Sequence, residues 1–138
     1  MWAVNFAIYY GIKCGYDEYL KSLRPVPSPY LVNGKLSKLA KQGESLFAKT
    51  GCVDCHHGDY TTNGLKYNAG TGVEEYDGVA FDTPSLKEVW RTAPYLYNGS
   101  AKTIKEVLVD FNKKDQHGAT SKLSEKELEA LEQYILSL

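Results

Sequence analysis

One five-residue motif, Cys52-x-x-Cys55-His56, constrains this chain more than any other feature of its sequence. Two thiols one helical turn apart can each add to a vinyl group on the same edge of a porphyrin. The imidazole that follows can then coordinate the iron, for which neutral imidazole is an ordinary ligand. This spacing is typical of covalent haem c attachment. The motif therefore predicts one covalent haem c with His56 as its proximal ligand.

Two other interpretations of these residues stay open. A disulfide between Cys52 and Cys55 would make a redox-active dithiol, but that motif belongs with a strand in a βαβ unit, which this sequence does not predict. A zinc ion could instead take both cysteines together with His56 or His57, although no second pair of ligands is evident. Outside such a site, His57 is expected to be a surface group, a group close to the haem, or a ligand of a neighbouring haem.

Composition sets the outer limits of the fold. The 138 residues suit a single hydrophobic core, and a hydrophobic share of 43% with 24% charged residues excludes wholesale disorder. No apolar run reaches the roughly 18 residues needed to span a bilayer. Sixteen basic and seventeen acidic side chains leave a net charge of −1. We therefore expect no membrane span and, without a basic stripe, no binding of nucleic acid.

Periodic apolar residues predict an all-α fold. Residues 2–23 carry an aromatic stripe at spacings of three and four, which indicates a helix: Phe6, Tyr9, Ile12, Tyr16, Tyr19 and Leu23. The stretch lacks a basic start and a cleavage site, so we interpret it as structure and not as a signal peptide. Prolines 25, 27 and 29 end this helix. The expected organisation is an N-terminal aromatic helix with a proline-rich connection over residues 1–27, followed by one helical domain over 28–138.

Four further helices are expected within the domain. One covers residues 37–49, and Thr83 before Pro84 predicts a short one ending near residue 90. Two capping boxes, at residues 103–106 and 124–127, predict helices that run to about residue 111 and to the C-terminus. Residues 58–82 form a long loop without a predicted strand, and such loops in compact domains are usually functional.

Two segments resemble c-type cytochromes. Residues 42–56 look like the first helix and attachment site of that family, in which a glycine lets the first helix cross the last one closely against an aromatic residue; Gly43 and Tyr134 match these roles. Residues 81–103 are similar to the C-terminal haem domain of the dihaem cytochrome c peroxidase and MauG-like group. Over residues 28–138, the resemblance implies a cytochrome c-like helical domain around one covalently bound haem, with long ordered loops.

The same resemblance implies further contacts with the haem. In that group the Arg-Thr-Ala-Pro-Tyr segment packs beside the haem, which makes Trp90, Arg91 and Tyr95 cofactor-binding candidates and Arg91 the partner of a propionate. A surface role for Arg91 is the alternative. The family usually has His-Asp-Gly or His-Asn-Gly where this chain has Tyr97-Asn98-Gly99. The sequence holds no second attachment motif, so two-haem chemistry within this one chain is not expected.

The second axial ligand is the least constrained feature. Most small cytochromes c use methionine, but the single methionine is Met1. We expect His117, which lies shortly before the last helix, to be the distal ligand, and a solvent-facing histidine is the alternative. Cys14 is the next candidate ligand; otherwise it is a small buried residue or forms an intermolecular disulfide. Ligation by Tyr95 or Tyr97 also stays open.

These features favour an electron carrier with a low-potential couple, because histidine replaces the methionine that raises potential. It would work with a redox partner protein and form a homo- or hetero-oligomer through its aromatic N-terminal segment. The alternatives are a protein that binds NO or CO, or the haem subunit of a peroxidase-type complex in which Glu74, Glu75 or Asp77 acts as acid or base. Because haem c is attached outside the cytoplasmic membrane, we expect a periplasmic or otherwise extracytoplasmic protein.

Overall fold

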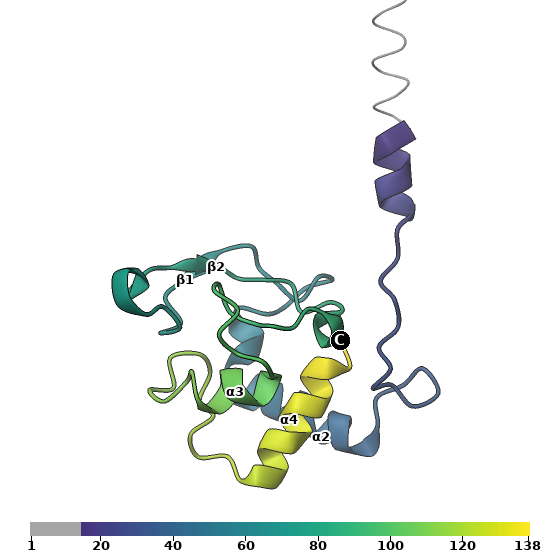
Figure 1. Ribbon diagram of the computed structural model, residues 1–138. Coiled ribbons are helices and arrows are strands. Elements are labelled where there is room, and N and C mark those ends of the chain that lie inside the picture. The colour runs from purple at the N-terminus through teal and green to yellow at the C-terminus, as the bar shows by residue number, and fades with distance from the viewer. Residues whose placement is uncertain (1–14) are drawn as a thin grey trace, which may run out of the picture.

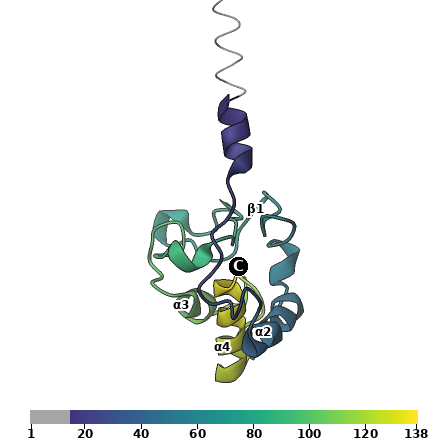
Figure 2. The ribbon, with the colours of Figure 1, turned by 90° about the vertical axis from the view of Figure 1, so that its right-hand side faces the viewer.

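The computed structural model describes residues 15–138 (Figure 1). Three helices form the body: α2 (Lys38–Lys49), α3 (Ile104–Val109) and α4 (Glu125–Leu136). A layer of loops covers one side of them, and residues 15–22 form a separate helix that points away from the body in both views (Figures 1 and 2). In the part of the chain that the structure describes, no helix is long and apolar enough to cross a membrane.

The two long helices begin where their caps predict. The Ser37 hydroxyl accepts a hydrogen bond from the Ala40 amide, 3.0 Å away, at the start of α2. At the start of α4, Ser124 and Glu127 form a complete capping box, so each side chain satisfies the backbone amide of the other. The short helix α3 begins after Thr103, whose hydroxyl accepts from the Glu106 amide. The predictions for these three helices are confirmed.

Helices α2 and α4 cross closely at Gly43. A Cβ atom on Gly43 would lie 1.9 Å from the carbonyl oxygen of Ala130 and 2.7 Å from the Cβ of Tyr134. Beside this contact, the ring of Phe47 meets the ring of Tyr134 edge-on, with their centroids 5.3 Å apart. The expected roles of Gly43 and Tyr134 at the crossing are therefore confirmed. The core extends from the crossing through Leu46, Phe47, Val89, Ile104, Leu108, Leu128, Ala130, Leu131 and Ile135.

The loop layer corrects two predictions. Strand β1 (Lys66–Tyr67) pairs antiparallel with β2 (Phe81–Asp82), where no strand was expected. The Thr83 amide and hydroxyl both donate to the Leu65 carbonyl, each at 2.9 Å, and extend this pairing. Thr83 is thus unavailable as a helix cap, and the helix expected after it is reduced to the 3-10 turn η3 (Val89–Arg91). Two further 3-10 turns, η1 (Cys52–Asp54) and η2 (Glu74–Tyr76), lie in the loops.

The proline-rich connection is fastened to the body at two points. The Val26 amide donates to a carboxylate oxygen of Glu88 at 2.5 Å, and the Ser28 hydroxyl donates to the Leu136 carbonyl, also at 2.5 Å. Ser28 is buried, whereas residues 15–27 are exposed. The connection therefore joins the body near residue 28, close to the boundary that the sequence predicts. The first half of the aromatic stripe, with Cys14, lies outside the described residues.

We expect the Gly43→Ala variant to lose about 3 kcal/mol of stability or more, because its methyl group would overlap backbone atoms of α4 that cannot turn aside as a side chain can. Urea unfolding followed by circular dichroism measures the loss. Gly15→Ala is the matched control, since Gly15 is helical and exposed, and a Cβ atom there would meet no described atom within 4 Å beyond its chain neighbours and the backbone of its own helix. Equal stability of the two variants would show that the crossing tolerates a larger residue.

Candidate functional site

A cavity of about 460 Å³ opens between the loop layer and the helices. This volume lies within the range of natural ligand sites, roughly 300–1,000 Å³. Its walls are mostly apolar, with Pro84, Leu86, Val89, Pro94, Ile104 and Val107 among the side chains that line it. Three residues that the sequence predicts to attach or coordinate a haem also line it: Cys55, His56 and His117. The structure therefore gathers the end of the cysteine motif and the candidate distal histidine around one space.

The attachment segment follows directly from the end of α2. Gly51 adopts the left-handed conformation, with φ of 82°, and turns the chain into η1. Both Cys52 and Cys55 are free and partly buried. The Cys52 sulfur lies 3.3 Å from the Thr50 hydroxyl, and burial raises the pKa of the Cys52 thiol. Over residues 15–138 no group of three or more His, Cys, Asp or Glu side chains is placed to hold a metal ion.

His56 is oriented by the loop that follows it. Its Nδ1 lies 3.2 Å from the Thr61 carbonyl, which accepts a hydrogen bond when that nitrogen carries the proton. This contact leaves Nε2 for the cavity side, the arrangement found when a histidine is held to bind a metal. Burial lowers the pKa of His56, against the hydrogen bonds to the Thr61 and Pro84 carbonyls, which raise it. The ring is therefore held as a neutral imidazole.

His117 faces His56 across the cavity. The centroids of the two imidazole rings lie 6.3 Å apart, and the ring planes make an angle of 43°. The His117 Nδ1 is buried and has no hydrogen-bond partner within residues 15–138. Burial, with a smaller contribution from His56, lowers the pKa of His117 to about 4. At neutral pH, His117 is thus an uncharged imidazole, the form that coordinates a metal.

Asn112 holds the loop that carries His117. Its side-chain oxygen accepts from the His117 amide at 2.8 Å, and its side-chain nitrogen donates to the Gly118 carbonyl at 2.7 Å and the Thr120 hydroxyl at 2.8 Å. The Ala119 amide donates to the Thr50 carbonyl at 2.9 Å, next to the attachment segment. Sequence reasoning missed Asn112, because an asparagine after a helix has no pattern that separates a buried anchor from a turn residue.

Of the three candidates that the family resemblance implied, one lines the cavity and two do not. Tyr95 lines the cavity, and its hydroxyl donates to the Val89 carbonyl at 3.0 Å. Trp90 does not line the cavity, but its indole Nε1 is buried without a hydrogen-bond partner in the described part of the chain. The Arg91 guanidinium lies outside the lining, half-exposed, and pairs with Glu88 at 2.7 Å. It also lies 5.9 Å from the Trp90 ring centroid. The hydrogen bond from Arg91, together with the one from the Val26 amide, lowers the pKa of Glu88.

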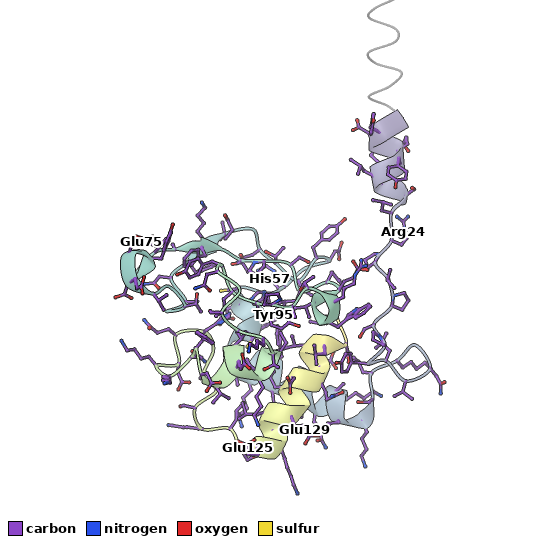
Figure 3. All side chains as sticks on the ribbon, viewed as in Figure 1. Arg24, His57, Glu75, Tyr95, Glu125 and Glu129 are labelled. Atoms are coloured by element: carbon purple, nitrogen blue, oxygen red, sulfur yellow. The ribbon has the colours of Figure 1, made fainter. Side chains whose placement is uncertain are left out.

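The acidic residues predicted for a peroxidase-type complex lie elsewhere. Glu74, Glu75 and Asp77 are exposed at η2, and none of them lines the cavity. Figure 3 shows Glu75 at the outer end of the loop layer, whereas His57 and Tyr95 lie near the middle of the molecule. The structure thus does not bring these acids to the cavity. His57 is exposed and Tyr97 lines the cavity, stacked on Phe81 with a centroid distance of 4.7 Å.

The chain is similar in sequence to several known proteins. Residues 80–116 match the family described as RoxA-like, cytochrome c-like. Hydrazine synthase subunit gamma of Kuenenia stuttgartiensis is 27% identical over 165 residues, covering 87% of this chain and 47% of that protein. Cytochrome-c peroxidase IdrP2 of Pseudomonas sp. (strain SCT) is 26% identical over 170 residues, covering 88% and 46%.

A solved structure shows the same similarity. A chain of Kuenenia stuttgartiensis hydrazine synthase pressurised with 20 bar xenon matches with a TM-score of 0.74 and 25% identity, over 87% of this chain and 52% of that one. The chain therefore spans about half the length of the relatives that it matches.

In sequence and fold the chain is similar to cytochrome c-like proteins, and its regular secondary structure over the described residues is mostly helical. The predicted relation to the cytochrome-c peroxidase group is confirmed, with hydrazine synthase subunit gamma as a further relative. A cytochrome c-like chain implies covalent haem c, and the residues around the cavity suit that group. The cysteine motif ends at the cavity wall, the lining is apolar, and two neutral imidazoles face each other across it.

We expect Asn112→Ala to cost about 2 kcal/mol or more, because it leaves the buried His117 amide and Gly118 carbonyl without their partner. Urea unfolding of the haem-loaded protein measures the loss. Asn98→Ala is the control, since the side chain of Asn98 is exposed and accepts only a local hydrogen bond from the Ser100 amide. An Asn112→Ala protein as stable as Asn98→Ala would mean that the loop does not depend on this anchor.

Proposed function

We propose that this chain is a monohaem c-type cytochrome that transfers electrons, with His56 and His117 as axial ligands of one haem. The observation that carries the proposal is the pair of neutral imidazoles facing each other across an apolar cavity beside Cys-x-x-Cys-His. When bound, the haem would supply a one-electron couple between ferric and ferrous iron. The chain would hold the group, orient both ligands and keep water from it.

The ring separation supports axial ligation on both faces. With a metal–nitrogen bond of about 2.0 Å and a nitrogen about 1.2 Å from the ring centre, two imidazoles on opposite sides of one metal ion would have centroids about 6.4 Å apart. The centroids of the His56 and His117 rings lie 6.3 Å apart, close to this value. Their angle of 43° fits the same arrangement, since each ring can turn about its own bond to the metal. Cys14, the alternative ligand, lies outside the described residues and stays a prediction.

Cys52 and Cys55 would fix the porphyrin edge through two thioethers. Both thiols are free and follow α2 at the spacing that the reaction requires. Trp90 would then donate its buried indole N–H to a propionate, because that donor has no acceptor among the described residues. Arg91 lies next to the Trp90 ring and keeps half its surface exposed, which suits a role at the outer edge of the haem.

Electron transfer fits this site better than catalysis. Two protein ligands would occupy both axial positions of the iron, so a substrate would find no free position. Imidazole in place of a methionine thioether favours a low potential. The acids Glu74, Glu75 and Asp77 do not line the cavity, so the geometry gives no support to the acid or base role considered for them in a peroxidase-type complex. Covalent haem c attachment also supports an extracytoplasmic location.

We expect a low-spin spectrum with haem c bands in both oxidation states, because two imidazoles give a strong ligand field. His117→Ala should lose the low-spin spectrum and raise the reduction potential. His57→Ala is the matched control, since His57 is exposed and adjacent to His56. Absorption spectra and a redox titration measure both effects. A high-spin wild type, or an unchanged His117→Ala spectrum, would remove His117 as ligand and favour Cys14 or an open iron.

We also propose that the N-terminal segment forms the contact between subunits. Tyr16, Tyr19, Leu20 and Leu23 are each more than half exposed and lie on one side of the helix at residues 15–22 and its end. A stripe of this kind on a helix that stands away from the body suits burial against another chain. One relative is named as the gamma subunit of hydrazine synthase, which supports an assembly with other chains.

We expect Leu20→Glu to reduce the mass of the assembly to that of a monomer, because a charge would lie within the apolar contact. Sedimentation velocity measures the mass. Ser22→Glu introduces the same charge two residues away, off the apolar stripe, and should leave the assembly intact. A monomeric wild type, or a Leu20→Glu assembly as large as the wild type, would contradict the proposed contact.

A further inference from the structure

We infer that His117 is the exchangeable ligand of the pair, and that a small neutral molecule replaces it on the iron while His56 stays bound. The inference rests on the proposed ligation by both histidines and adds a second activity to the same site, the reversible binding of a small uncharged ligand. Carbon monoxide is the probe of this chemistry, because it binds ferrous haem iron and carries no charge.

The two histidines differ in the hydrogen bond made by Nδ1, the ring nitrogen that would not coordinate the iron. A neutral imidazole that coordinates through Nε2 carries its proton on Nδ1. At His56 that proton meets the Thr61 carbonyl, 3.2 Å away. At His117, Nδ1 is buried, and no group in residues 15–138 accepts its proton. Coordination therefore leaves His117 with an unsatisfied buried donor, whereas the same step at His56 does not.

This difference acts directly on the strength of the bond. A hydrogen bond from the outer N–H of a ligating histidine orients the ring and makes its other nitrogen more basic, and loss of such a partner typically costs 10–100-fold in affinity. The Thr61 carbonyl that serves His56 is itself well placed, since the Thr61 hydroxyl accepts from the Leu86 amide at 2.9 Å. His117 has no comparable support for its ring. It is therefore the weaker of the two ligands by about this factor.

The backbone on the His117 side is held firmly. Asn112 binds the His117 amide, and Asp115 accepts from the Thr120 amide at 3.0 Å and the Ser121 amide at 2.9 Å. The Ala119 amide is bound to the Thr50 carbonyl. A firmly held backbone with an unsupported ring means that the exchange is a rotation of the His117 side chain. The loop itself need not unfold.

The surroundings of His117 select the incoming ligand. Ile104 and Val107 of α3 line the cavity together with His117. Of the residues that line the cavity, Asp82 on β2 is the one with an acidic side chain, and no lysine or arginine lines it. An anion would lose its hydration without finding a partner of opposite charge, whereas a small neutral molecule has little hydration to lose. The site therefore favours an uncharged ligand over an anion.

The test follows the reduced, haem-loaded protein after it is mixed with carbon monoxide in the absence of oxygen. We expect the wild type to take up carbon monoxide at a rate that becomes independent of its concentration, because departure of His117 limits the reaction. His117→Ala should react at least tenfold faster and in proportion to the concentration. The final spectra of the two proteins should be the same, since His56 is the remaining ligand in both. His57→Ala should behave as the wild type.

The outcomes separate this inference from the proposed function. A wild type that is low-spin and stays unchanged at saturating carbon monoxide would overturn the inference and leave the ligation by both histidines standing. A wild type that takes up carbon monoxide as fast as His117→Ala, and in proportion to its concentration, would also overturn it, because departure of His117 would then not limit the reaction. A wild type that is high-spin before mixing would contradict the proposed function itself. If His117→Ala does not fold, His117→Gln and the concentration dependence of the wild-type rate serve the same purpose.

Discussion

The close crossing of α2 and α4 at Gly43 is the contact on which the geometry of the site depends. The backbone of Gly43 lies against the Ala130 carbonyl with no room for a side chain between them. The last turn of α2 leads through Gly51 into the cysteine motif and His56, and the loop that precedes α4 carries His117. Each histidine is therefore connected to one of the two crossing helices. Their separation of 6.3 Å follows from how closely and at what position these helices meet.

Thr50 joins the two halves of this arrangement. It is buried at the end of α2, where its hydroxyl donates to the Leu46 carbonyl at 2.8 Å and lies next to the Cys52 sulfur. Its carbonyl accepts from the Ala119 amide, two residues after His117. Thr50 thus contacts the start of the attachment segment through its side chain and the end of the His117 loop through its backbone carbonyl. Buried polar groups of this kind are stabilising because every one of them has a partner.

The parts of the fold that the sequence predicted are those decided by near neighbours in the chain. The capping boxes at Thr103 and Ser124 need only residues three positions apart, and both helices begin there. Gly43 was assigned its role from a family resemblance, and the structure shows the same contact. For the site, the motif placed His56 at the cavity, and the position of His117 before the last helix placed it opposite.

The failures come from contacts between residues far apart in the sequence. Thr83 has the pattern of a helix cap, but its amide and hydroxyl are taken by the Leu65 carbonyl eighteen residues earlier. Glu88, within the helix that was expected, adopts a left-handed conformation with φ of 59° and binds the Val26 amide. Neither partner is visible from the local pattern. Asn112 was missed for the same reason, because its importance lies in the groups that the fold brings to it.

Among residues 15–138, two buried side-chain nitrogens have no hydrogen-bond partner, Trp90 Nε1 and His117 Nδ1, and they differ in what the haem would offer them. The Trp90 donor would meet an acceptor once a propionate lies beside it, so binding of the haem relieves its cost. The His117 donor gains nothing from the haem, because coordination at Nε2 places the proton on the nitrogen that has no acceptor. With the proposed ligation, the chain would therefore bind its cofactor tightly and still hold His117 weakly. In a site of this kind, a buried polar group without a hydrogen-bond partner is therefore informative. It indicates either a donor that the cofactor would bind, as at Trp90, or a ligand that the cofactor would leave weakly held, as at His117.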